Sequence, residues 1–124
     1  MKNIDIITLA NTGALAATAH DLPVAHAYKL IAFKRAVRKQ LEEIVEREKA
    51  IKDDPREEEL RKELYNEEIT LEGVKTMPFE VYHALARENR AVPMHTGKDQ
   101  VVQFDPFTIS EDVLEGVLWV APEE

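Results

Sequence analysis

Apolar residues recur with the period of an α-helix through the longest patterned stretch of this chain, from Pro23 to Lys52. They follow one another at intervals of three, four or seven positions: Leu30, Phe33, Val37, Leu41, Ile44 and Ile51. Residues at these spacings share one face of a helix. The pattern therefore predicts a single amphipathic helix, and about 30 residues at 1.5 Å each give a length of about 45 Å.

A chain of 124 residues suits one domain, and the predicted helix is long for a domain of that size. A compact domain of this size has a radius of gyration of only about 14 Å. We therefore expect one end of the helix to project from the fold or to be covered by another chain.

The run Asp53-Asp54-Pro55 predicts that the chain turns after this helix and begins a second one. Asp54 can cap the new helix, Pro55 suits its first turn, and Glu57 stands where a capping box places its carboxylate. We expect the second helix to end near residues 66–68. A connection this short makes the two helices antiparallel neighbours.

The rest of the chain carries shorter patterns, each bounded by residues that favour turns or helix caps. We expect strands over residues 3–9, 69–74 and 100–104, short helices over 13–19, 79–86 and 110–118, and a loop or hairpin turn over 91–99. The fold class is then mainly α, of the α+β type. A single domain, 1–124, would combine a long antiparallel helical hairpin, about 23–68, with short helices and a small α/β portion, about 69–124.

Charge is divided unevenly along the predicted long helix. Residues 22–41 contain no acid but five bases, Lys29, Lys34, Arg35, Arg38 and Lys39. Residues 42–72 carry thirteen acids against six bases, and the whole chain has a net charge of −8. This acidity disfavours nucleic acid as a partner, because phosphate binding draws on Lys and Arg.

The basic half of the helix has three interpretations. It is neutralised by acids of this chain or of a second copy, it meets an acidic protein partner, or it contacts nucleic acid or an acidic lipid surface. We favour the first. A membrane-spanning segment is not expected, since the uncharged stretch 6–20 falls short of the ~20 residues that span a bilayer.

Candidate catalytic and metal chemistry is sparse. The chain has no cysteine, and its four glycines are isolated, so thiolate sites and phosphate-binding glycine loops are excluded. No histidine has a second histidine three or four positions away, which disfavours a metal site. Glu80, His83 and Arg87 have helical spacing, a pattern more typical of a surface network than of an acid–base pair. We expect no cofactor and no enzyme activity.

The run Leu22-Pro23-Val24-Ala25-His26-Ala27-Tyr28-Lys29-Leu30, leading into a long charged helix, resembles a family of small phage- and prophage-encoded proteins. The segments 69–72 and 77–79 also follow that family's general pattern, whereas residues 91–124 depart from it. The function of that family is not established, so the resemblance implies no catalytic residues. It implies a virion-assembly or accessory role, in a bacterial cytoplasm or in a virion.

Together, these patterns predict a non-enzymatic interaction or assembly protein that self-associates through its long helix, as a dimer or a higher oligomer. The expected interaction surface comprises Lys29, Phe33, Lys34, Val37, Arg38, Leu41 and Ile44. One alternative is a nucleic-acid-associated module that uses the bases of residues 29–39. The other is a small hydrolase-like enzyme with Glu80, His83 and His95 in one cleft.

Overall fold

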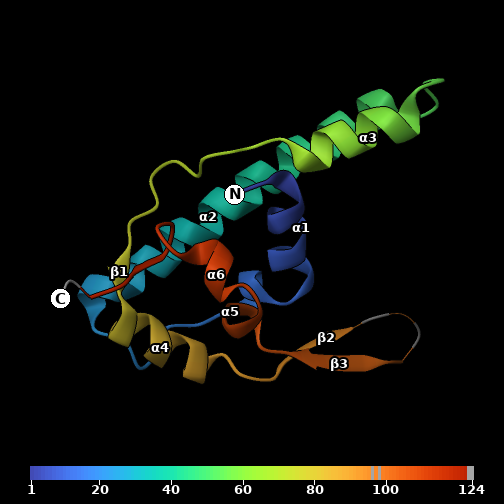
Figure 1. The fold of residues 1–124 in the computed structure, drawn as a ribbon. Helices are drawn as coiled ribbons and strands as arrows, with labels where there is room; N and C mark the ends of the chain where they lie inside the picture. Colours follow the sequence, from blue (N-terminus) through green and yellow to red (C-terminus); the bar gives the residue numbers. More distant parts are fainter. Residues whose placement is uncertain (96, 98, 123–124) are drawn as a thin grey trace.

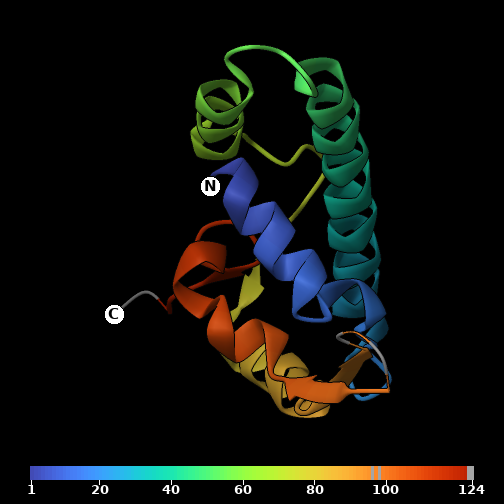
Figure 2. The ribbon, with the colours of Figure 1, turned by 90° about the vertical axis from the view of Figure 1, so that its right-hand side faces the viewer.

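One long helix, α2 (Val24–Ile51), runs along one side of the molecule, and the other helices lie on its inner side (Figure 1, Figure 2). The computed structural model describes residues 1–95, 97 and 99–122. The helices are α1 (Asn3–Asn11), the 3-10 helix η1 (Ala14–Ala16), α2 (Val24–Ile51), α3 (Glu57–Asn66), α4 (Phe79–Glu88), α5 (Pro106–Ile109) and α6 (Glu111–Leu114).

The strands are short and form two separate pairs. β1 (Met77–Pro78) pairs in parallel with β4 (Trp119–Val120), and β2 (Val92–His95) pairs antiparallel with β3 (Val101–Phe104). The protein is therefore mainly helical with a small β component, which confirms the predicted fold class.

The helical hairpin is confirmed, with bounds close to those predicted. After α2, Asp53 adopts a left-handed conformation (φ 67°), and the Asp54 carboxylate accepts a hydrogen bond from the Arg56 N–H (2.8 Å). This local turn delays the start of α3 until Glu57. Figure 1 shows α3 lying back along the C-terminal part of α2, and this end of the hairpin extends beyond the rest of the fold.

The predicted strand over residues 3–9 is wrong, because these residues form helix α1. Ile6 and Leu9, three positions apart, are fully buried, and the Asp5 carboxylate accepts a hydrogen bond from the Lys2 N–H (2.8 Å). A short β-branched run fits a period of two or of 3.6 almost equally well. Packing of α1 against α2 and α3 decides between the two.

Asn3 joins the three helices of this region. Its buried side chain donates to the Leu64 carbonyl on α3 (2.8 Å) and accepts from the Gln40 side chain on α2 (2.8 Å). Buried polar groups of this kind are costly unless they are hydrogen-bonded, and here both ends of the amide have a partner. The contact therefore favours one alignment of α1 on the hairpin.

The helix predicted for residues 13–19 shrinks to η1, a single 3-10 turn. At Ala17 the backbone becomes extended (ψ 147°), and its carbonyl accepts a hydrogen bond from Lys34 of α2 (2.8 Å). Thr18 then pairs both of its backbone groups with the side chain of Asn89 (2.9 and 2.8 Å). Hydrogen bonds to distant side chains thus replace those that would have continued the helix.

Residues 69–74 do not form the predicted strand, and the chain returns from α3 to β1 in an irregular path. Beyond it, the predicted helix 79–86 is confirmed as α4 and the strand 100–104 as β3. The loop or turn predicted for 91–99 contains β2, and positions 96 and 98 lie outside the described residues. The final helix is only α6, four residues long, followed by Gly116 at φ 79°.

Aromatic rings hold this C-terminal part together. Phe79 and Trp119 meet edge to face with centroids 5.0 Å apart, and Tyr82 contacts Phe107 in the same way at 6.1 Å. The Tyr82 hydroxyl donates to the Phe107 carbonyl (2.6 Å), and the Trp119 indole donates to the Glu111 carbonyl (2.8 Å). Burial raises the pKa of Tyr82, and the Glu111 charge adds to the effect.

Candidate interaction surface

The apolar half of the predicted interaction surface faces the protein's own core. Phe33, Val37 and Ile44 are almost completely buried, and Leu41 is half-buried against the same core. Helices α1 and α3 pack on α2. Because this chain covers the stripe itself, Phe33, Val37 and Ile44 cannot contribute to a surface contact, and the prediction was wrong for them.

The predicted bases lie at the edge of this contact rather than in the core. Lys29 donates to the Thr76 carbonyl (3.0 Å), and Lys34 donates to the Ala17 carbonyl (2.8 Å). Partial burial lowers the pKa of Lys34, with a further contribution from the charge of Arg38. Arg38 makes only a long hydrogen bond to the Leu15 carbonyl (3.4 Å) and is exposed. These side chains fasten neighbouring backbone to α2.

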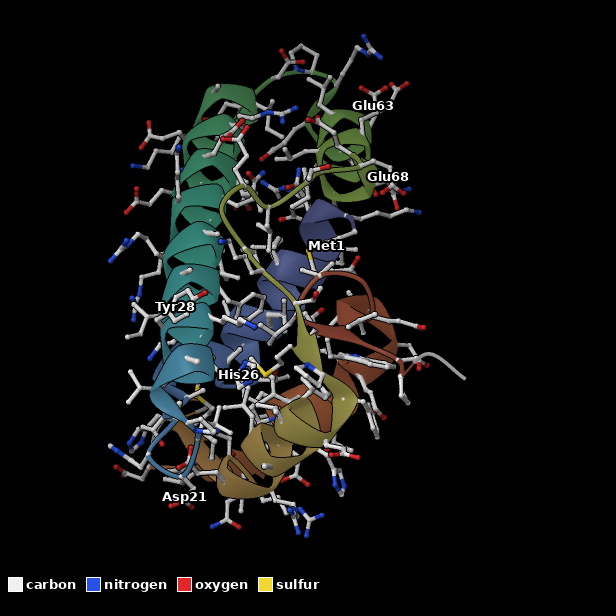
Figure 3. The ribbon with its side chains drawn as sticks, turned by 90° about the vertical axis from the view of Figure 1, so that its left-hand side faces the viewer. Met1, Asp21, His26, Tyr28, Glu63 and Glu68 are labelled. Carbon is white, nitrogen blue, oxygen red and sulfur yellow. The ribbon has the colours of Figure 1, made fainter. Side chains whose placement is uncertain are left out.

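A second row of apolar residues lies on the outward side of α2. The exposed fractions are 87% for Val24, 49% for Tyr28, 57% for Ile31 and 41% for Val45. Figure 3 shows His26 pointing toward β1, whereas side chains on the opposite side of α2 project away from the fold. The predicted interaction surface lay on a different stripe and left these residues out. Val24, Tyr28 and Ile31 are four and three positions apart, and Val45 lies 14 positions beyond Ile31.

Charged residues complete the outward side. Arg35 and Lys39 are exposed in its first half, and Glu42, Glu43 and Glu46 are exposed in its second. Over residues 1–95, 97 and 99–122, no ion pair joins a base of positions 29–39 to an acid. The charge division predicted from the sequence therefore persists on the folded surface, and none of these bases makes a direct ion pair with an acid of the described residues.

Two shallow hollows lie along the same side of α2. One, of about 310 Å³, is lined by Arg38, Leu41, Glu42, Val45 and Glu46. The other, of about 300 Å³, lies between α2 and the segment 17–20, and Ile31 lines it. Both present apolar atoms bordered by charged groups, an arrangement suited to helix or side-chain contact rather than to bond-making chemistry.

The residues of the hydrolase-like alternative do not converge. Glu80 and His83 are exposed on α4, where the His83 ring stacks on Phe79 (centroids 5.9 Å apart), and His95 is exposed on β2. Glu80 lines a hollow of about 550 Å³ with Pro78 and Val120, but neither histidine lines it. No hydrogen bond or ion pair in the described part of the chain links Glu80, His83 and His95, so their geometry gives this alternative no support.

The described residues contain neither a metal-binding cluster nor a membrane-spanning helix. They contain no group of three or more His, Asp or Glu side chains arranged to hold a metal ion. None of their helices combines the length and apolar character needed to cross a bilayer.

Comparisons with family models, with curated proteins and with solved structures found no match for this chain.

Proposed function

We propose that this protein is a non-enzymatic interaction or assembly protein that self-associates through the outward side of α2. One observation carries the proposal: Val24, Tyr28, Ile31 and Val45 are exposed on one side of a single helix. Scattered apolar residues are normal on protein surfaces, whereas an aligned row rimmed by charges is typical of a contact site.

The charges favour a second copy as the partner over nucleic acid. A protein of net charge −8 repels phosphate. Of the five bases in residues 29–39, Lys29 and Lys34 already donate to backbone carbonyls of this chain. The resemblance to phage-encoded proteins is consistent with an assembly role, and an acidic protein remains the alternative partner.

The experiment is light scattering over a series of protein concentrations. We expect the apparent mass to rise from one chain toward two as the concentration increases. Ile31→Lys should hold the mass at one chain, because it places a positive charge in the apolar row. The matched control is Ile109→Lys, since Ile109 on α5 is also an isoleucine and is exposed to a similar extent, 54% against 57%.

Two results would contradict the proposal. One is the mass of a single chain at every concentration. The other is identical behaviour of Ile31→Lys and Ile109→Lys, which would locate the contact elsewhere. The nucleic-acid alternative predicts binding to a short duplex at low salt, and loss of that binding when the charges of Arg35 and Lys39 are reversed. Both results together would support that alternative over self-association.

A further inference from the structure

We propose that α2 pairs antiparallel with α2 of a second copy, about a two-fold axis level with Gln40. This inference rests on the proposed function and specifies its geometry. The outward side of α2 follows alternating steps of three and four residues, the spacing that keeps one side of a helix facing a partner helix. The positions on α2 are Tyr28, Ile31, Arg35, Arg38, Glu42, Val45 and Lys49, and Lys52, the residue directly after the helix, continues the row.

These positions are arranged symmetrically about residue 40. Arg38 and Glu42 each lie two residues from it, and Arg35 and Val45 each lie five residues from it. The same symmetry relates Ile31 to Lys49, at nine residues, and Tyr28 to Lys52, at twelve. A two-fold axis at this level therefore places each position opposite a position of the same row. Any row with these alternating steps has such a midpoint, so the case for the axis depends on which residues meet across it.

Three of the four pairs have complementary chemistry, and the fourth places the stem of Arg35 beside Val45. Arg38 of each copy faces Glu42 of the other, so the charge pair occurs twice across the axis. The stem of Lys49 can cover Ile31 while its ammonium stays in water, and the ammonium of Lys52 can lie over the ring of Tyr28. Within the described chain, the Arg38 guanidinium donates one hydrogen bond, the long one to the Leu15 carbonyl. Its other N–H groups can therefore donate to a partner.

A parallel pair would bring like charges together. Arg38 would then face the partner copy's identical arginine, and Glu42 would face the identical glutamate. Juxtaposed like charges oppose association and select against that arrangement. The division of charge along α2, whose bases at positions 29–39 make no direct ion pair with acids of the described residues, therefore favours the antiparallel orientation.

The outward side is accessible along the whole proposed contact. Arg35, Arg38, Glu42, Lys49 and Lys52 are all exposed. In both side views the ribbon of α2 forms one margin of the molecule, and no other helix or strand of the described residues lies over its outer side (Figure 2, Figure 3). A second helix can therefore lie along it without displacing any part of the fold.

The size of the contact predicts a weak, salt-sensitive association. Tyr28 and Lys52 are 24 positions apart, which corresponds to about 36 Å of helix, and a helix offers a strip about 10 Å wide. Two copies would then bury roughly 700 Å² in total, below the ~1,200 Å² of a standard stable interface. We expect dissociation constants in the micromolar range or weaker, and weaker association in high salt because the charge pairs are exposed.

Disulfide trapping tests the orientation, and the chain has no native cysteine to interfere. We would make R35C and V45C separately, because both leave the Arg38–Glu42 pairs intact. Mild oxidation of an equimolar mixture should give a disulfide-linked dimer of the two variants, detectable by mass spectrometry. Each variant alone should stay uncrosslinked, since its two copies lie about 15 Å apart along the helix, beyond the 4.4–6.8 Å between Cα atoms that a disulfide spans.

Charge reversal provides a second measurement in case the cysteines weaken the contact. R38E and E42R should each lose self-association in light scattering, and an equimolar mixture of the two should recover it. V102E on the β2–β3 hairpin is the control that should leave the association unchanged.

The possible failures are distinguishable. Self-crosslinking of each cysteine variant alone would show a parallel pair and overturn the antiparallel inference while preserving self-association. A wild-type protein that associates, but with no crosslink in the mixture and no recovery from charge reversal, would also overturn this inference alone. A wild-type protein that stays a single chain at every concentration would overturn both this inference and the proposed function.

Discussion

The helical part, α1 to α3, and the C-terminal part, β1 to β4, are held together by different kinds of contact. In the helical part an apolar stripe on α2 is buried against its neighbours, including Phe33, Val37 and Ile44. In the C-terminal part the rings of Tyr82 and Trp119 are buried, and each also donates a hydrogen bond to a backbone carbonyl.

The difference lies in how specific the contacts must be. Burial of aliphatic surface is non-directional, so the helical part depends mainly on the volume and the pattern of its side chains. A buried ring with a hydrogen-bonding atom must also place that atom correctly, because an unpaired buried group is costly. We therefore expect the helical part to respond most to loss of volume and the C-terminal part to loss of single polar atoms.

The largest effect is expected for Phe33→Ala on the inner side of α2. Removing this fully buried ring should lower the free energy of unfolding by about 3–5 kcal/mol, because it leaves a cavity. Ile31→Ala, on the outer side of the same helix, should change it by no more than about 0.5 kcal/mol. Urea denaturation at a concentration where the protein is monomeric measures both. Equal effects would contradict the assignment of inner and outer sides.

A smaller effect is expected for Tyr82→Phe in the C-terminal part. The substitution keeps the ring but leaves the Phe107 carbonyl without its donor, at a cost of about 1–3 kcal/mol in the free energy of unfolding. The control is Tyr28→Phe on the outer side of α2, where the ring is half exposed. If the two substitutions changed the free energy of unfolding equally, the Tyr82 hydrogen bond would not be a special source of stability for the C-terminal part.

The same substitution should change the response to alkaline pH. Burial, reinforced by the charge of Glu111, raises the pKa of Tyr82, so the folded state favours the neutral phenol. The resulting stability is fully present below the unfolded tyrosine pKa of about 10 and is lost as pH rises above it. Tyr82→Phe should therefore lose less stability than the wild type between neutral pH and pH values above 10.

The smallest effect is expected for Glu67→Gln in the helical part. The Arg47 guanidinium donates to both Glu67 carboxylate oxygens (3.0 and 2.6 Å), and these hydrogen bonds lower the pKa of Glu67. Both side chains are more than one-third exposed, so solvent screening limits the pair to about 0.2–1 kcal/mol. Chemical denaturation at neutral pH should show a small decrease in the free energy of unfolding for Glu67→Gln and no decrease for the exposed control, Glu72→Gln.

The sign of its pH dependence is opposite to that of Tyr82. Because the folded-state pKa of Glu67 is lowered, its stabilisation is present above the unfolded value of about 4.3 and is lost as pH falls through the folded value. Glu67→Gln should remove this acid-dependent component. The expectation would be contradicted if the difference in free energy of unfolding between Glu67→Gln and the wild type grew as the pH fell below 4.

Local patterns predicted the helical hairpin closely but predicted α1 and η1 poorly. The stripe on α2 repeats over many turns, so one misleading residue cannot obscure its period. Residues 3–9 span barely two turns, and contacts of Asn3 with Leu64 and Gln40, both distant in sequence, accompany the helix that forms there. Likewise, the Ala-rich run gives way after η1 because its backbone bonds to Lys34 and Asn89.

The sequence correctly predicted α2 as a helix and the division of its charges, because both are properties of consecutive residues. A contact role for α2 stays a prediction. The predicted apolar contact residues proved to be core residues, and Val24, Tyr28, Ile31 and Val45 were overlooked. Periodicity locates an apolar stripe on a helix but does not state whether the same chain covers it.

What the sequence determined by itself is therefore the long helix, its turn at residues 53–55 and its charge division. Helical hydrogen bonds link residues four apart, so nearby residues are sufficient to specify them. Only the tertiary structure decided which side of α2 is buried and which is open to a partner. Burial depends on segments far along the chain, here α1 and α3, and no local pattern records where those segments pack.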